Sequence, residues 1–113
     1  MDPMRDQKVL KQLQLESRIG RVASQLELAR RYRTGVGAPH DLDKARYWFE
    51  QAATQGDEEG VYNLALMLLR GEGGNSDPEA GRALLIELAA DSSLENARGW
   101  ARQALLALRD HET

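Results

Sequence analysis

Large and small apolar residues recur along the chain at a constant offset of 36 positions. The pair Leu28-Ala29 is followed by Leu64-Ala65 and then by Trp100-Ala101. Self-similarity with a period between about 20 and 50 residues is typical of helical repeat arrays. A large residue followed by a small one suits a helix that packs closely against its neighbour. The pattern therefore predicts a structural unit that is repeated along the chain.

Residues that end and begin helices keep the same offset. Gly35 maps to Gly71, and Asp41 maps to Asp77. Glycine adopts the positive φ that closes a helix C-terminus without steric strain. A short carboxylate at the N-cap accepts hydrogen bonds from the first-turn N–H groups, which have no partner within the helix. These positions are therefore predicted to mark the boundaries of the repeated helices.

The same signals divide the chain into six predicted helices. Asp57 and Ser92 supply N-caps for two of them. Leu and Ala greatly outnumber Val and Ile, which favours helices over strands. The predicted fold class is therefore all-α, with about six helices arranged as antiparallel pairs. The expected segments are Asp2 to Ser17, Arg21 to Thr34, Asp41 to Gln55, Asp57 to Arg70, Asp77 to Ala90 and Ser92 to Arg109.

Two segments in the middle of the chain have the pattern of a known repeat. Residues 60–73 read GVYNLALMLLRGEG, and residues 43–57 read DKARYWFEQAATQGD, with an aromatic pair and a closing Ala-Ala-x-x-Gly. They resemble, in that order, the first helix with its loop and the second helix of Sel1-like repeats. The resemblance spans about Ala23 to Ala101 and implies a right-handed superhelix, an α-solenoid related to tetratricopeptide arrays. It also implies an adaptor or scaffold role in protein complexes.

The 113 residues are expected to form one domain, because chains of this length rarely divide. Residues 1–20 are expected to form an N-terminal helix that caps the array, and residues 93–113 a C-terminal half repeat with a short tail. Residues 21–56 and 57–92 are expected to form the two repeats. The second repeat departs from the family pattern, since Leu84-Leu85 stand where Trp48-Phe49 stand in the first.

If the helices stack as in tetratricopeptide arrays, the first helix of each repeat lines an inner groove. Its inward positions place apolar residues between two pairs of arginines. Such a groove suits a peptide with apolar anchors and flanking acidic groups, because arginine binds carboxylates bidentately and a desolvated apolar patch supplies affinity. The predicted partner-binding residues are Arg30, Arg33, Tyr62, Leu66, Leu69, Arg98, Arg102 and Leu105.

Three alternatives remain open for these residues. The leucines could pack internally while the arginines pair with Glu27 or Glu95. The C-terminal helix could instead form a homodimer through Leu105, Leu106 and Leu108, since a terminal helix of a repeat array usually carries a polar outer face. A small regulatory ligand could also bind in the groove. The sequence thus predicts a protein or peptide partner without naming it.

Composition and motifs argue against most chemistry. The chain has no Cys, and 15 Lys plus Arg against 18 Asp plus Glu give a net charge of −3. His40 and His111 lack the neighbours of a metal site or a catalytic triad. The loop from Gly71 to Asp77 lacks the Lys-Ser/Thr ending of a phosphate loop. A non-catalytic protein without metal or cofactor is therefore expected.

Charge and hydropathy also bear on partners other than proteins. In the basic run from Arg30 to Arg33, helical spacing places only the first and last arginines on one face, which does not favour nucleic acid. No stretch approaches the roughly 20 apolar residues of a membrane helix, and the first residues do not read as a signal peptide. A cytoplasmic protein that binds neither nucleic acid nor membrane is expected.

Overall fold

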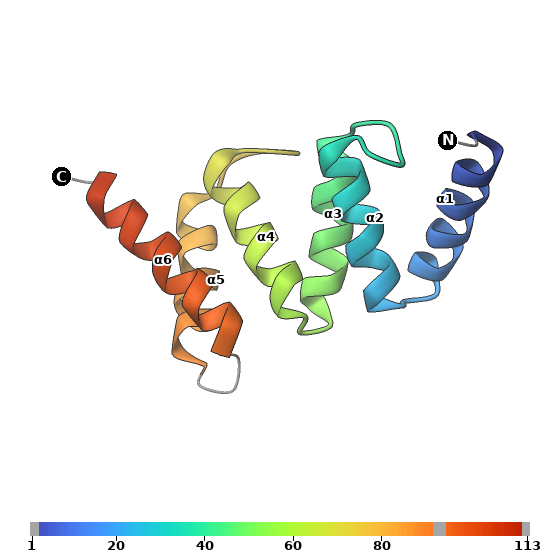
Figure 1. The fold of residues 1–113 in the computed structure, drawn as a ribbon. Coiled ribbons are helices and arrows are strands. Elements are labelled where there is room, and N and C mark those ends of the chain that lie inside the picture. The colour runs from blue at the N-terminus through green and yellow to red at the C-terminus, as the bar shows by residue number, and fades with distance from the viewer. Residues whose placement is uncertain (1–2, 92–94, 112–113) are drawn as a thin grey trace.

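The chain forms a row of antiparallel helices (Figure 1). The computed structural model describes residues 3–91 and 95–111, and within these ranges it contains six helices and no strand. The predicted all-α solenoid is confirmed. In the described part of the chain, no helix is long and apolar enough to cross a membrane. The helices are α1 (Pro3–Arg18), α2 (Val22–Thr34), α3 (Leu42–Thr54), α4 (Glu58–Arg70), α5 (Pro78–Ala90) and α6 (Glu95–His111).

The helix boundaries follow the signals in the sequence. Asp41, Asp57 and Asp77 each accept a hydrogen bond from the backbone N–H three residues later, at 3.1, 2.9 and 3.1 Å. Gly35 and Gly71 end α2 and α4 in the left-handed conformation, with φ of 76° and 69°. These caps are confirmed. The predicted cap at Ser92 lies outside the described residues.

The array is elongated because its helices pack mainly against their neighbours in sequence. Each consecutive pair of helices is in contact, and α4 also contacts α6. The molecule measures 50 × 28 × 23 Å, with a radius of gyration of 15.0 Å. A spherical domain of this length would have a radius of gyration of about 13 Å. In an elongated array of this kind, much of the surface of each helix is accessible to solvent.

Two hydrophobic clusters hold the array together. The first is centred on α2 and α3 and includes Leu28, Tyr32 and Phe49. The second joins α4, α5 and α6 through Ala65, Leu85, Leu88, Ala97 and Ala101. Ala29, Ala65 and Ala101, the small residues of the repeated step, are all completely buried.

The loop after α4 braces that helix against α3. A Cβ at Gly73 would lie 2.2 Å from the carbonyl oxygen of Leu42, so only glycine allows this close approach. Arg46 on α3 donates to the carbonyl oxygens of Glu72 at 3.3 Å and Asn75 at 2.9 Å. The glycine-rich loop is therefore engaged in packing within the array.

Candidate functional site

Polar side chains close the junction between α2 and α4. Arg30 on α2 donates two hydrogen bonds to the carboxylate of Glu59 on α4, at 2.8 and 2.5 Å. These hydrogen bonds are the main cause that raises the pKa of Arg30 above its ordinary value. Arg30 is therefore paired within the chain, with Glu59 in addition to Glu27, the glutamate that one alternative named.

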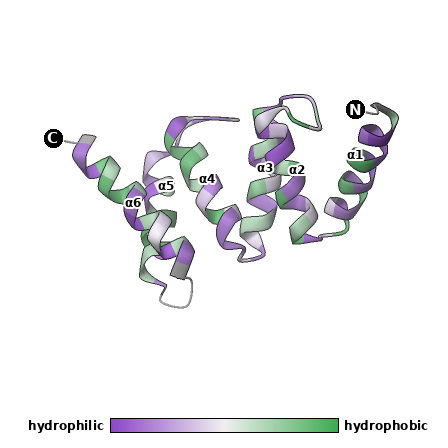
Figure 2. Cartoon of the chain, viewed as in Figure 1, coloured by the Kyte–Doolittle hydropathy of each residue, from purple (hydrophilic) through white to green (hydrophobic). Residues whose placement is uncertain are grey.

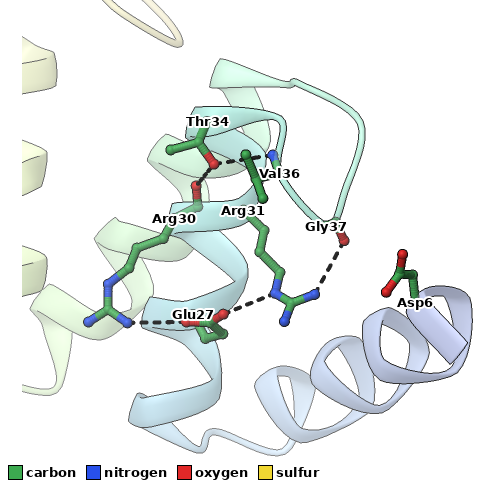
Figure 3. Close-up of a pocket in the computed structure, with 7 residues that line it drawn as sticks. All are labelled: Asp6, Glu27, Arg30, Arg31, Thr34, Val36 and Gly37. Atoms are coloured by element: carbon green, nitrogen blue, oxygen red, sulfur yellow. Dashed lines mark hydrogen bonds and ion pairs between the residues drawn. The ribbon is translucent and has the colours of Figure 1, made fainter. Parts of the chain in front are cut away.

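Glu27 extends this network along α2. Its carboxylate lies between the guanidinium groups of Arg30 and Arg31, at 3.3 and 3.0 Å (Figure 3). The hydrogen bond from Arg31 is the main cause that lowers the pKa of Glu27 below its ordinary value of 4.5. Glu27 thus helps to hold the two arginines in place.

Arg33 is held at the same junction. It donates a hydrogen bond to the side-chain oxygen of Asn63 on α4, and its guanidinium lies 5.5 Å from the ring centroid of Phe49. Asn63 in turn donates to the backbone carbonyl of Glu59 at 2.9 Å. Both arginines were predicted to bind a partner. Instead, Arg30 contacts α4, and Arg33 contacts both α3 and α4.

The junction between α4 and α6 is open and largely apolar. A hollow of about 380 Å³ lies between these two helices. Its α4 side contains all three predicted apolar residues, and Figure 2 shows the hydrophobic stretch in the C-terminal half of α4 from which two of them come. The lining residues are Tyr62, Leu66, Leu69, Arg70, Ala104, Ala107 and Leu108.

A second hollow continues from the first toward the polar junction. It has a volume of about 320 Å³, is lined by Glu59, Tyr62, Asn63 and Trp100, and shares Tyr62 with the first hollow. The rings of Tyr62 and Trp100 lie 5.5 Å apart at an angle of 51°. Trp100 is 41% exposed, so its ring is within reach of solvent. The two hollows together make a trough with an aromatic pair at its centre.

The predicted residues of α6 lie away from this trough. Arg102 is exposed, Arg98 is half-buried, and Leu105 packs against the second hydrophobic cluster. With about 100° of rotation per residue, Arg98, Arg102 and Leu105 share one side of α6, while Trp100 and Ala107 lie on the opposite side. The structure thus brings Tyr62, Leu66 and Leu69 together but does not place the α6 residues beside them.

The difference comes from the register of α6. At an offset of 36, Gly60 and Met67, which pack toward α3 and its cluster, map to the exposed residues Asn96 and Gln103, although Ala65 keeps a buried counterpart in Ala101. At an offset of 37, Gly60 and Met67 map instead to Ala97 and Ala104, which belong to the second cluster or pack against it. α6 therefore packs one residue later than the repeat period predicts.

Sequence reasoning missed seven residues that border the trough. The larger hollow adds Arg70, Ala104, Ala107 and Leu108, and the smaller one adds Glu59, Asn63 and Trp100. A signal for two of them was present, because Trp100 and Ala104 are separated by one helical turn and both fall on the side of α6 that faces α4. Only the register of α6 decides that this side faces the trough.

The residues suggested for self-association differ in exposure. Leu106 is 52% exposed, whereas Leu105 and Leu108 are partly buried against the second cluster.

The acidic run at the start of α4 has structural roles in the fold. Asp57 caps the helix and Glu59 binds Arg30, as described above. His40 is exposed in the loop between α2 and α3.

Comparisons with known proteins agree with this repeated architecture. A model of the Sel1 repeat matches residues 22–57 and 59–93. Over 64 residues, the chain is 42% identical to an exopolysaccharide production negative regulator of Rhizobium leguminosarum bv. viciae. That match covers 53% of this chain and 24% of the regulator, so the chain spans about a quarter of its relative's length.

Two solved structures are similar in shape. A protective antigen of uropathogenic Escherichia coli strains, which displays an SLR fold, has a TM-score of 0.62 and 36% identity, over 67% of this chain and 16% of that protein. A Sel1 repeat protein from Oxalobacter formigenes has a TM-score of 0.65 and 21% identity, over 74% of this chain and 65% of that one. The second likeness is one of fold alone.

Proposed function

Because the chain belongs to the Sel1 repeat family, whose members are generally non-catalytic protein–protein interaction modules, we propose that it works by binding a protein segment in the trough between α4 and α6. The bound segment inserts apolar side chains beside Tyr62, Leu66 and Leu69. The relative from Rhizobium is named as a regulator, and this supports a regulatory or adaptor role. Of the predicted partner-binding residues, Tyr62, Leu66 and Leu69 are the ones that line the trough.

The observation that supports this function is the contrast between the trough and the rest of the face. The hollow between α4 and α6 is apolar and open, whereas Arg30 and Arg33 are already engaged with α4. Recognition sites draw much of their affinity from desolvated aromatic and aliphatic patches. Tyr62 and the leucines provide such a patch, and the small side chains of Ala104 and Ala107 leave room above it.

The test fills the hollow from its exposed rim. Random dodecapeptides displayed on phage are selected on the wild-type chain, and the enriched peptides are titrated by fluorescence polarisation. In the variant Ala107→Phe the aromatic ring occupies the hollow, so affinity is expected to fall at least about tenfold. Unfolding free energy should change by less than about 1 kcal/mol, because Ala107 is exposed.

Ala83→Phe is the matched control, since Ala83 is an exposed alanine on α5 away from the trough. It should bind the selected peptides like wild type. The proposal fails if no peptide is enriched or if both variants bind equally well. A mass of twice the monomer in light scattering, reduced by Leu106→Glu, would favour the homodimer alternative.

A further inference from the structure

The side of α6 that faces away from α4 carries arginines together with leucine. Arg102, Leu106 and Arg109 are exposed there, and Arg98 is half-buried. Helical rotation places all four within about 80° of one another, nearly opposite Trp100. This surface, here called the outer stripe of α6, consists of Arg98, Arg102, Leu106 and Arg109.

The stripe occupies positions that are covered on α4. At the offset of 37, Arg98, Arg102 and Leu106 are the counterparts of Val61, Ala65 and Leu69. Those three α4 residues belong to the second cluster and pack under α5. Gly81 of α5 approaches them so closely that an added Cβ would lie 2.8 Å from the carbonyl oxygen of Ala65. On α4, this side of the helix is covered by α5. On α6, the equivalent side is rich in arginine.

We infer that the outer stripe of α6 is a docking surface for an acidic amphipathic helix of a partner protein, which packs on α6 as α5 packs on α4. Leu106 and the aliphatic stems of the arginines provide apolar contact. Arg98 and Arg102 require carboxylates on the incoming helix, because an arginine covered by an apolar helix would leave its charge unpaired. This surface is separate from the trough, so the inference does not depend on the proposed function.

Charge distinguishes a partner helix from a second copy of this chain. α1 is the helix whose exposed apolar residues, Met4, Val9 and Leu15, would make it the candidate in a second copy. It also exposes four cationic side chains, namely Arg5, Lys8, Lys11 and Arg18. Cationic residues facing the arginines of the stripe would repel them. An acidic helix is therefore the occupant that fits.

The test uses a helix whose packing on this kind of surface is known from the structure. The probe is a fluorescein-labelled peptide with the sequence of residues 77–91 carrying Leu84→Glu. Leu84 packs against the same cluster as Val61 and Ala65, so the new carboxylate would lie beside their counterparts Arg98 and Arg102. The matched peptide carries Leu84→Lys. Both are titrated against the wild-type chain and Arg102→Glu.

The acidic peptide is expected to bind wild type saturably, and Arg102→Glu should weaken it at least about tenfold. The Leu84→Lys peptide should bind the Arg102→Glu variant more tightly than it binds wild type. A variant that merely disturbed the fold would weaken both peptides and would not reverse their order of affinity. Ala107→Glu, on the opposite side of α6, should leave binding unchanged.

Four results would overturn the inference. The acidic peptide could fail to bind at concentrations up to about 1 mM. It could bind wild type and Arg102→Glu equally, or lose affinity on Ala107→Glu instead. Finally, concentration-dependent dimers that are lost in Arg102→Glu would identify a second copy as the occupant.

Discussion

Two junctions between neighbouring helices follow one another along the array and are filled in opposite ways. Between α2 and α4, Arg30 and Arg33 reach across to polar groups of α4. In the next repeat, Leu66 and Leu69 stand at the equivalent positions and border an open hollow. The two helices have the same length and the same glycine cap. The repeat therefore determines where side chains point, and their chemistry determines whether a junction is closed or open.

The comparison also separates stability from recognition. Arginines that look suited to a partner's carboxylate become part of the scaffold when the next helix offers glutamate or asparagine. Leucines that look like core remain accessible when the next helix offers alanine. Arg30 and Leu66 illustrate both cases at one repeat position. A position in a repeat thus acquires its role from the residue opposite it on the adjacent helix.

The largest effect is expected where a single substitution disturbs the helix that both junctions share. Ala65 on α4 is completely buried in the second cluster. Ala65→Asp would place an unpaired carboxylate there and should lower the unfolding free energy by more than about 3 kcal/mol. Urea unfolding followed by circular dichroism measures this loss. Ala83→Asp, at an exposed site on α5, should cost far less, and equal costs would contradict the described packing.

A smaller effect should follow when the closed junction is made to resemble the open one. Arg30→Leu introduces the residue of its counterpart Leu66 and removes both hydrogen bonds to Glu59. Because the ion pair is partly exposed, the loss should be about 1 kcal/mol. A double-mutant cycle that combines Arg30→Leu with Glu59→Gln should give a coupling energy that favours the folded state. This coupling energy should decrease with added salt. No coupling would mean that the pair does not hold the junction together.

The smallest effect concerns pH and should be confined to the closed junction. The pKa of Glu27 is lowered from 4.5, so its carboxylate stabilises the fold above that pH. This contribution disappears as the pH falls through the lower pKa of the folded state. Glu27→Gln should therefore destabilise the chain at pH 7 by about 0.5 kcal/mol or less, since Glu27 is partly exposed. Urea midpoints of the two proteins should converge as the pH falls well below 4.5, and a difference that grows in acid would refute this.

The sequence predicted the helices well because their ends depend on local chemistry. Asp41, Asp57 and Asp77 bond to N–H groups only three residues away, and Gly35 and Gly71 need only their own φ. Such signals do not depend on the rest of the fold. The apolar residues Tyr62, Leu66 and Leu69 could be placed together on α4 for a different reason, because helical spacing brings them to one side of a single helix.

The α6 side of the site could not be predicted in this way. Its register slips by one residue relative to α4, and this depends on how Ala97 and Ala104 fit against the second cluster. A rotation of about 100° moves Arg98 and Arg102 from an inward position to the outer stripe. The partners of Arg30 and Arg33 are likewise residues 29 and 30 positions away, which only tertiary contacts identify.

The neighbour-to-neighbour packing of the helices also has a kinetic consequence. Contacts that join residues close in sequence require little loop closure, and chains dominated by them fold within microseconds to milliseconds. The pair α2–α3, with Phe49 and Leu28 completely buried, offers the bulkiest side chains for a nucleus. Folding is then expected to spread outward from this pair, so the helices at the two ends of the row should form last and exchange their amide protons first.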